Sequence, residues 1–231
     1  MTNLINKIRT GISASLFLPA LLLLIAASPV FGNGSPEGLP LEPSRTAMET
    51  IEGTESAVFA GGCFWGVEGV FEQLRGVQEV VSGYSGGDAD TASYYKVGSG
   101  KTGHAESVRI EFDPAQISFE KLLEVFFIVA HNPTELNFQG PDIGTEYRSV
   151  VFYSDDVQKV TTEQFIRKLE AAEIYKDPIV TEVVPLDEFY PAEDYHQDFL
   201  RLNPGHPYIV YWDLPKIRHL EKMYPDLIAD K

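Results

Sequence analysis

The spacing of apolar residues changes near residue 62. Residues 57–60 form a short apolar run that is typical of a buried strand, whereas apolar residues recur at helical intervals from Phe64 to Leu74. Gly61 and Gly62 separate the two patterns, and glycine permits the sharp change of direction that such a switch needs. This stretch therefore predicts a strand, a tight turn and a helix.

Similar switches follow along the chain, separated by two polar loops at 88–105 and 131–147. The remaining predicted elements are strands at 77–84, 106–112, 149–153 and 179–186, and helices at 118–130, 154–175 and around 215–223. The order β-α-β-β-α-β predicts an α+β fold. We expect a two-layer α/β sandwich with a mixed sheet and a split βαβ (ferredoxin-like) core, followed by an irregular C-terminal segment.

Residues 1–32 carry a different pattern. Two basic residues precede an apolar block at 12–27, and the stretch contains no acidic residue. This arrangement is typical of a secretory signal peptide. We expect cleavage near Gly32 or Ser28 and an exported protein, in the periplasm or outside the cell. A retained membrane anchor is the alternative, although the block is short for a membrane span and Pro19 interrupts it.

The rest of the chain predicts one domain. Residues 33–53 are rich in Pro, Gly, Ser and Glu, which is typical of a flexible lead-in. Residues 54–231 show no internal repeat and no second linker. Only two of the 18 Lys and Arg residues, and none of the 34 Asp and Glu residues, lie in 1–32. The mature chain is thus strongly acidic, which argues against nucleic acid and anionic membranes as partners, because both would repel it.

Cys63 is the sole cysteine of the chain. It lies at the predicted N-terminus of a helix, where free amides and the helix dipole stabilise a thiolate, the reactive form of cysteine. A single thiol in an exported protein is buried and inert, paired between chains, or reactive. A core cysteine that only fills space is the simplest alternative. The glycines before Cys63 and the aromatic pair Phe64 and Trp65 after it favour a reactive thiol.

Glu106 is a candidate proton donor because it begins a predicted strand directly after a glycine-containing loop. A carboxyl group there is either a solvated edge charge or, if buried, an acid with a raised pKa. The run from His104 to Glu106 also matches the first half of the zinc deaminase signature, but that signature needs a Cys-x-x-Cys pair. The chain lacks such a pair and shows no ligand cluster among its five histidines, so we predict no metal.

Polar loops hold further candidates. Asp142 and Tyr147 lie in one loop, Tyr94 in another and Tyr195 near the C-terminus. Each residue could serve only turn formation or cover the sheet. A tyrosine also combines an apolar ring with one hydroxyl, which suits a substrate that is partly apolar and partly a strong hydrogen-bond acceptor.

Five blocks of residues stand out in this order: GCFWG at 62–66, GYSGG at 83–87, TGHAE at 102–106, DIGTEYRS at 142–149 and YPAEDYHQ at 190–197. Together they resemble the A-type peptide-methionine sulfoxide reductases, and the similarity covers about residues 55–212. The resemblance implies an oxidoreductase that reduces methionine S-sulfoxide, free or in proteins, to methionine, and so repairs oxidative damage.

The resemblance also implies roles in catalysis. Cys63 would attack the sulfoxide sulfur and become a sulfenic acid, while Glu106 would protonate the oxygen. Tyr94 and Tyr147 would hydrogen-bond that oxygen, in the manner of an oxyanion hole. Asp142 would order the polar network of the site.

Substrate contacts are implied as well. Phe64 and Trp65 would pack against the ε-methyl group of the substrate, and Tyr195 is assigned to the same site. The resemblance implies no bound cofactor, and we expect a monomer.

The chain departs from its implied family in two ways. Many relatives carry C-terminal cysteines that reduce the sulfenic acid by forming a disulfide, and this chain has none. We therefore predict a one-cysteine enzyme that is recycled by an external thiol: a thioredoxin-like protein, a glutaredoxin-like protein or a small thiol. In addition, Glu146 stands where the family often has Gln, and Phe138 and Pro141 replace polar residues. These changes affect the substrate rim, and the added carboxylate could raise the pKa of Glu106.

Two other functions remain as alternatives. A cysteine hydrolase would use Cys63 with His104 or His196 as its base, and it requires an imidazole within hydrogen-bonding reach of the sulfur. A non-catalytic module would bind methionine sulfoxide in an aromatic cleft and would not need the thiol of Cys63.

Overall fold

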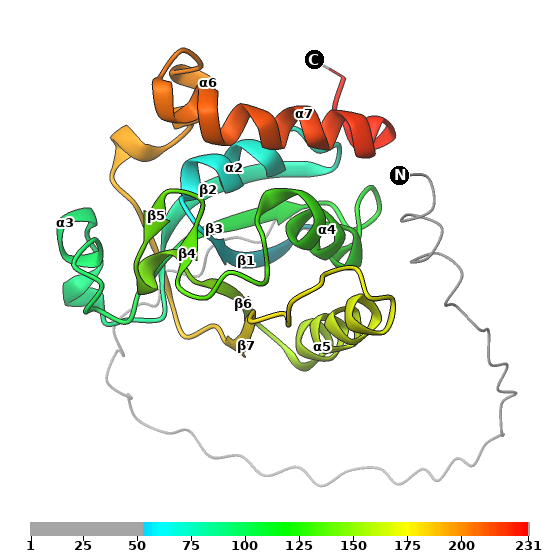
Figure 1. Cartoon of the computed structure of the whole chain (residues 1–231), viewed down its shortest axis with the longest axis horizontal. Helices are drawn as coiled ribbons and strands as arrows, with labels where there is room; N and C mark the ends of the chain where they lie inside the picture. Colours follow the sequence, from blue (N-terminus) through cyan, green and yellow to red (C-terminus); the bar gives the residue numbers. More distant parts are fainter. Residues whose placement is uncertain (1–52, 231) are drawn as a thin grey trace, which may run out of the picture.

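The computed structural model describes residues 53–230 (Figure 1). The predicted signal peptide at 1–32 and all but the last residue of the predicted lead-in at 33–53 lie outside these residues, so both stay predictions. Within the described part, every helix is too short or too polar to span a membrane.

Six strands form one mixed sheet in the order β7-β6-β1-β3-β2-β8. The strands are β1 (Glu55–Gly61), β2 (Val77–Ser85), β3 (Ala105–Phe112), β6 (Ser149–Tyr153), β7 (Glu182–Pro185) and β8 (Phe189–Pro191). Neighbouring strands are antiparallel except for β6 and β7. Because β3 lies between β1 and β2, the first βαβ unit is split as predicted. The α+β fold is confirmed.

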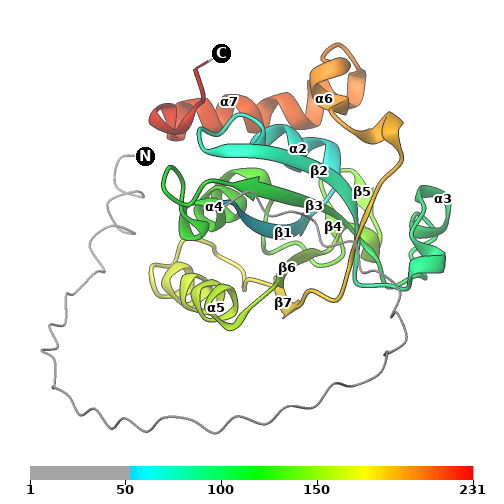
Figure 2. The same ribbon diagram turned by 180° about the vertical axis from the view of Figure 1, so that it is seen from behind.

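One face of the sheet carries the main core. It packs against α2 (Phe64–Phe71), α4 (Phe119–Val125) with its π-helical extension η2 (Phe126–Ala130), α5 (Asp156–Ala171) and α7 (Leu214–Met223). Alternate residues of β1 divide between the faces, so that Phe59 joins this core while Val58 joins a smaller cluster on the opposite face. The view from behind shows α7 lying along α2, which places the C-terminal part of the chain beside the helix that follows Cys63 (Figure 2).

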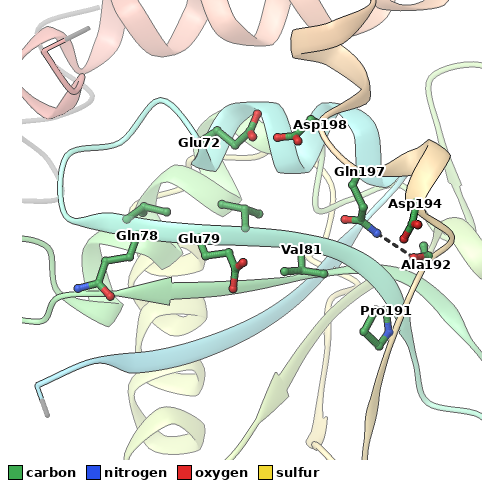
Figure 3. A pocket seen from close by; sticks show the side chains of 11 residues that line it. Glu72, Gln78, Glu79, Val81, Pro191, Ala192, Asp194, Gln197 and Asp198 are labelled. Atoms are coloured by element: carbon green, nitrogen blue, oxygen red, sulfur yellow. Dashed lines mark hydrogen bonds between the residues drawn. The ribbon is translucent and has the colours of Figure 1, made fainter. Parts of the chain in front are cut away.

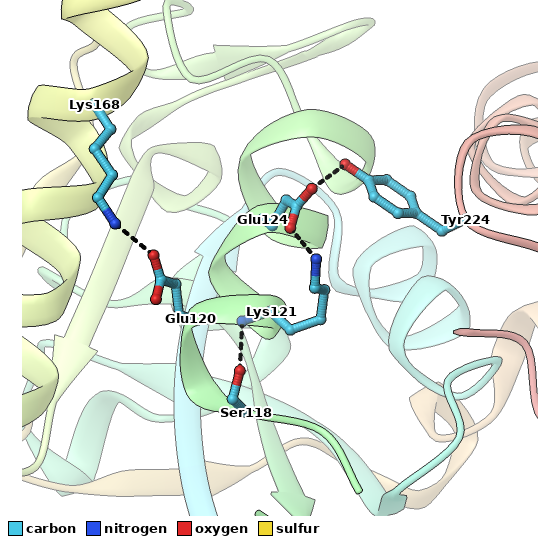
Figure 4. A network of polar contacts seen from close by, with 6 residues as sticks. All are labelled: Ser118, Glu120, Lys121, Glu124, Lys168 and Tyr224. Carbon is cyan, nitrogen blue, oxygen red and sulfur yellow. Dashed lines mark hydrogen bonds and ion pairs between the residues drawn. The ribbon is translucent and has the colours of Figure 1, made fainter. Parts of the chain in front are cut away.

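Polar contacts tie α4 to the elements beside it (Figure 4). Lys121 pairs with Glu124 one turn along the helix, and Glu124 also accepts a hydrogen bond of 3.1 Å from the hydroxyl of Tyr224 at the end of α7. On the other side, Lys168 of α5 lies 2.6 Å from Glu120. The helix layer is therefore joined by side-chain contacts as well as by its apolar core.

The helix starts follow the sequence prediction. Ser118 caps α4 by accepting a 3.2 Å hydrogen bond from the backbone N–H of Lys121. Asp155 caps α5 in the same way, with a distance of 2.8 Å to the backbone nitrogen of Gln158. In both cases the side-chain oxygen satisfies an N–H group that has no partner within the helix.

The predicted loops are more structured than their composition suggests. The 88–105 loop contains η1 (Ala89–Thr91) and α3 (Tyr94–Val97), and the 131–147 loop contains the hairpin β4 (Phe138–Gln139) and β5 (Asp142–Ile143), then η3 (Thr145–Tyr147). The hairpin is fixed from outside itself, because the amide of Gln139 bonds both backbone groups of Asn132. Strands of two residues leave no period in a sequence.

The secondary structure after residue 178 also differs from the prediction. The strand predicted at 179–186 is shorter, since only β7 pairs with β6. The segment predicted as irregular holds four short helical elements besides α7: η4 (Asp194–His196), α6 (Phe199–Leu202), η5 (Ile209–Asp213) and η6 (Pro225–Leu227).

Candidate active site

Cys63 lies at the N-cap of α2, directly after the turn that ends β1. Gly62 has a φ of +89°, a conformation that favours glycine. A Cβ atom at Gly62 would also lie only 2.6 Å from the Cβ of Gln139 in the hairpin. The turn thus needs glycine both for its backbone and for the close approach of the hairpin, and the predicted strand, turn and helix are confirmed.

The thiol of Cys63 is protonated at rest. Burial raises its pKa well above the ordinary value, and the carboxyl groups of Glu106, Asp213 and Asp142 raise it further. The backbone N–H of Trp65 in the first turn of α2 lowers the pKa, as a helix N-terminus should, but this effect is the smaller one. The expected thiolate is therefore not the resting form, because burial and the carboxyl groups outweigh the helix.

Glu106 is a buried acid that remains protonated at neutral pH. Its side chain is 3% exposed, and its Oε2 atom accepts a 3.1 Å hydrogen bond from the backbone N–H of Phe64. Burial raises its pKa to about 8, with Asp142 and Glu146 adding to the rise and the N–H of Phe64 opposing it. The solvated edge charge is excluded. The carboxyl group that Glu146 adds to the family pattern acts on Glu106 in the expected direction.

Tyr94 and Tyr147 reach the same place from different elements. Tyr94 begins α3, and Tyr147 ends η3. Burial raises the pKa of both hydroxyls, and Glu106 and Cys63 raise it further in each case once they are ionised. Both tyrosines therefore remain neutral hydrogen-bond donors beside the acid and the thiol.

Glu193 positions Tyr94. One of its carboxyl oxygens accepts a 3.1 Å hydrogen bond from the backbone N–H of Tyr94, and the other accepts one of 2.9 Å from the hydroxyl of Tyr84. The carboxylate thus joins α3 to β2 across a long stretch of sequence. Sequence reasoning did not assign this residue a role, although it lies within the YPAEDYHQ block.

The aromatic wall beside Cys63 is held by His196 and Phe199. The indole N–H of Trp65 donates to Nδ1 of His196 at 3.2 Å, and its ring stacks on Phe199 with centroids 3.7 Å apart. The ring of Phe64 is fully buried, 5.0 Å from the imidazole of His196. Tyr195 lies at the rim, 63% exposed, with its ring centroid 4.3 Å from that of His196.

A small pocket of about 50 Å³ opens beside Cys63. Its lining comes from the hairpin and from the C-terminal segment: Gln139, Gly140, Pro141, Asp142, Tyr208, Trp212 and Lys216. The hydroxyl of Tyr208 donates a hydrogen bond to Asp142 and so joins the two parts. Sequence reasoning missed Tyr208 and Lys216, because no motif surrounds them and they are remote in sequence from the residues they meet.

Neither proposed histidine base serves Cys63. The Nε2 atom of His104 lies 3.0 Å from the carbonyl oxygen of Asp88, and His196 is bonded to the indole of Trp65. Within residues 53–230, no histidine is hydrogen-bonded to the sulfur, so the requirement of the hydrolase alternative is not met. No group of three or more His, Cys, Asp and Glu side chains in this part of the chain could hold a metal ion.

A second, larger pocket of about 490 Å³ lies between β2 and the segment after β8 (Figure 3). Four carboxyl groups line it: Glu72, Glu79, Asp194 and Asp198. It contains none of the residues that surround Cys63. The chemistry of this protein therefore gathers around Cys63, which lines the smaller pocket and interacts with the buried acid Glu106 and with the hydroxyls of Tyr94 and Tyr147.

Comparison with known proteins agrees with this arrangement. The family model for "Peptide methionine sulfoxide reductase" matches residues 55–227. The chain is 56% identical over 179 residues to "Peptide methionine sulfoxide reductase MsrA 2" of Mesorhizobium japonicum, a match that covers 78% of this chain and 92% of that protein. It is 52% identical over 187 residues to the protein of the same name from Synechocystis, covering 81% of this chain and 87% of that one.

Solved structures show the same similarity. Reduced Mxr1 from Saccharomyces cerevisiae superimposes with a TM-score of 0.64 at 30% identity, over 70% of this chain and 92% of that one. Methionine sulfoxide reductase A of Corynebacterium diphtheriae gives a TM-score of 0.59 at 35% identity, over 68% of this chain and 78% of that one.

Proposed function

The chain belongs to the peptide methionine sulfoxide reductase family and is an oxidoreductase that reduces methionine sulfoxide, and from this premise we propose that Cys63 is its only redox centre. We propose further that the substrate is the S epimer, that an external thiol recycles the enzyme, and that the protein repairs oxidised methionine in exported proteins. The observation that carries the mechanism is the buried, protonated Glu106 beside the sole cysteine.

In the reductive step, the sulfur of Cys63 attacks the sulfoxide sulfur while Glu106 gives its proton to the sulfoxide oxygen. The bond between the two sulfur atoms then breaks as the protonated oxygen passes from the substrate sulfur to the sulfur of Cys63, which releases methionine and leaves a sulfenic acid on Cys63. The thiol proton of Cys63 replaces the proton lost by Glu106. The substrate sulfur gains two electrons, the cysteine sulfur loses two, and no proton is taken up. Tyr94 and Tyr147 donate hydrogen bonds to the oxygen as charge develops on it.

The aromatic wall supplies the apolar half of the site. Phe64 and Trp65 receive the methyl group, which cannot accept a hydrogen bond, while the hydroxyls of the tyrosines receive the oxygen. Tyr195 at the rim is placed to contact the chain on either side of the oxidised methionine. The two ends of the sulfoxide group are thus distinguished by chemistry, which orients the sulfur toward Cys63.

Recycling needs two external thiols. The first attacks the sulfenic acid, forms a mixed disulfide with Cys63 and releases water; the second attacks that disulfide and restores the thiol of Cys63. This route follows from the sequence, since the chain contains no other cysteine that could form an internal disulfide. A thioredoxin-like protein, a glutaredoxin-like protein or a small thiol would satisfy the same chemistry.

A single-turnover experiment tests the reductive step. Residues 33–231 are mixed with a peptide that contains methionine S-sulfoxide, without reductant, and the products are weighed. We expect one methionine per protein and a protein mass increased by one oxygen atom. The R epimer serves as control and should not react. Equal methionine yields from the wild type and from Cys63→Ser would overturn the proposal.

Export is tested separately. We expect the protein expressed from the full sequence to be recovered outside the cytoplasm with a new N-terminus near residue 33. Recovery of uncleaved protein in the membrane fraction would support a retained anchor, whereas full-length protein in the cytoplasm would contradict export.

A further inference from the structure

Asp213 and Lys216 form an ion pair beside the site, and no motif pointed to either residue. Asp213 ends η5 and is fully buried, and its Oδ1 atom lies 3.3 Å from Nζ of Lys216, three residues later in α7. We propose that this pair adjusts how readily Cys63 loses its proton, with the two residues acting in opposite directions. They are positioning residues that act through the thiol, and the inference rests on the proposed role of Cys63 as the attacking group.

The ion pair of Asp213 and Lys216 lies against the first turn of α2. Gly66 lies in the first turn of the helix that Cys63 caps. A Cβ atom at Gly66 would lie 2.0 Å from Oδ1 of Asp213 and 2.8 Å from Nζ of Lys216. Only glycine leaves room for both charged groups against this turn. The last glycine of the GCFWG block thus admits the pair to the helix terminus at which the thiol lies.

The carboxylate of Asp213 has one partner, Lys216, among the described residues. Among the described residues, Lys216 is the one cation within ion-pair distance of Asp213, and no other group donates a hydrogen bond to its carboxyl oxygens. A buried carboxylate with a single counter-ion changes its effect on its surroundings strongly when that ion is removed. Lys216 also lines the pocket of Cys63, so both members of the pair adjoin the sulfur's surroundings.

The charged and titratable groups around the thiol come from several elements. They are Glu106 from β3, Asp142 from β5, Glu146 and Tyr147 from η3, Tyr94 from α3, Tyr208 before η5, Asp213 at the end of η5 and Lys216 from α7. Of the residues that the structure describes, Lys216 is the only cation in the lining of the pocket. Among the carboxyl groups, Asp213 ranks second to Glu106 in raising the pKa of Cys63, and Asp142 follows.

Opposite charges in one pair predict opposite effects. Replacement of Asp213 by Asn removes a negative charge beside the sulfur, so the thiolate becomes easier to form. Replacement of Lys216 by Met leaves the carboxylate without its counter-ion, so the thiolate becomes harder to form. Burial raises the pKa of Cys63, so the two effects are compared at alkaline pH, where a thiolate forms.

The test is the rate at which iodoacetamide alkylates the reduced protein near pH 9, followed by mass spectrometry. Cys63 is the only thiol, so the alkylation reports this residue alone, and the dependence of the rate on pH separates the thiolate fraction from access to the sulfur. A change of about one pKa unit is typical of one nearby charge, so we expect a rise of about tenfold in Asp213→Asn and a fall of about tenfold in Lys216→Met. The double variant should return to within about threefold of the wild type.

Two controls separate charge from shape. Lys216→Arg keeps the positive charge and should stay close to the wild-type rate. Asp198→Asn breaks the ion pair of Asp198 with Arg201, which lies on the exposed side of α6, and should leave the rate unchanged. A melting curve for each variant shows that it is folded.

The outcomes are distinct from those of the proposed function. Rates that shift in the same direction in both single variants, or in neither, would reduce the pair to a structural role and overturn the inference. Such a result leaves the single-turnover reaction of the wild type untouched. Conversely, an active Cys63→Ser variant would reject the proposed function even if the alkylation rates shifted as expected.

Discussion

The two sides of the Cys63 pocket are built by different means. On one side, which we call the sheet side, Cys63 and Glu106 are held by β1, β3 and α2, whose own hydrogen bonds fix the backbone. On the other side, which we call the C-terminal side and which comprises residues 208–216, the contacts are between side chains, such as Tyr208 with Asp142. The thiol and the acid are thus held by long, regular elements. Asp213, which raises the pKa of Cys63 together with Glu106 and Asp142, lies on the C-terminal side.

This difference predicts that substitutions on the sheet side cost the most activity. Glu106→Gln keeps an acceptor for the N–H of Phe64 but cannot supply a proton, so we expect kcat/KM to fall by about 100- to 10,000-fold with little change in Tm. In the wild type, kcat/KM should fall as pH rises through about 8, because Glu106 loses its proton there. The role of Glu106 would be contradicted if Glu106→Gln kept a tenth of the activity. It would also be contradicted if kcat/KM of this variant fell near pH 8 as in the wild type.

A substitution at Gly66 should disrupt the contact between the two sides, which Gly66 makes with Asp213. Alanine normally stabilises a helix relative to glycine by about 1 kcal/mol, but here its Cβ would collide with Asp213. We expect Gly66→Ala to lower the free energy of unfolding by about 1–3 kcal/mol and to expose residues 208–216 to proteolysis first. Gly69→Ala is the matched control: its Cβ would meet only the apolar side chain of Leu200, most closely at the terminal Cδ1 (2.6 Å), and should cost less. A Gly66→Ala protein as stable as the wild type would show that the two sides do not touch as described.

A milder change on the C-terminal side should have a milder effect. Tyr208→Phe removes the hydrogen bond to Asp142 but keeps the ring that lines the pocket. Loss of a hydrogen bond to a charged group corresponds to a fall of about tenfold in kcat/KM, measured against the S-sulfoxide peptide. Tyr195→Phe, at the exposed rim, should change it by less than about threefold. If both variants behave alike, the C-terminal side contributes no specific contact to the reaction.

The substitution with the smallest expected effect on activity changes stability alone. Glu68 of α2 is buried, and burial raises its pKa to about 7. The folded protein therefore holds this proton more tightly than the unfolded chain, so Tm should fall as pH rises from about 4.5 to about 7 and change little from this group above that. In Glu68→Gln that decline should be smaller by about 5–10 °C, with activity unchanged. An identical decline in both proteins would mean that the carboxyl group of Glu68 is solvated.

Much of the sheet side could be predicted from the sequence. The change from an apolar run to helical spacing placed Cys63 at the start of a helix, and Ser118 and Asp155 marked the starts of two more. These signals are local, because a strand, a glycine turn and a helix cap each depend on neighbouring residues. The protonation of Cys63 was not predictable in this way. It depends on burial and on carboxyl groups that arrive from three other elements.

The C-terminal side could not be predicted for the same reason. Tyr208 meets Asp142 from 66 residues away, and Asp213 meets Gly66 from even further. The two-residue strands of the hairpin are held by Gln139, whose partners lie outside them. Contacts of this kind leave no period in one sequence, and a resemblance carries them only where a motif includes them. Glu193 lies inside such a motif, so its role could have been predicted from the sequence.

The stack of Trp65 on Phe199 gives the protein an optical reporter of its own. The chain has two tryptophans, one in this stack and the other, Trp212, nearly half exposed on the C-terminal side. The enclosed indole should emit at shorter wavelength and resist acrylamide, whereas Trp212 should emit at longer wavelength and be quenched readily. A ligand that packs against Trp65 then alters the blue part of the spectrum, and one that enters the pocket beside Trp212 alters the red part, so occupancy of the two sides of the site can be followed without a label.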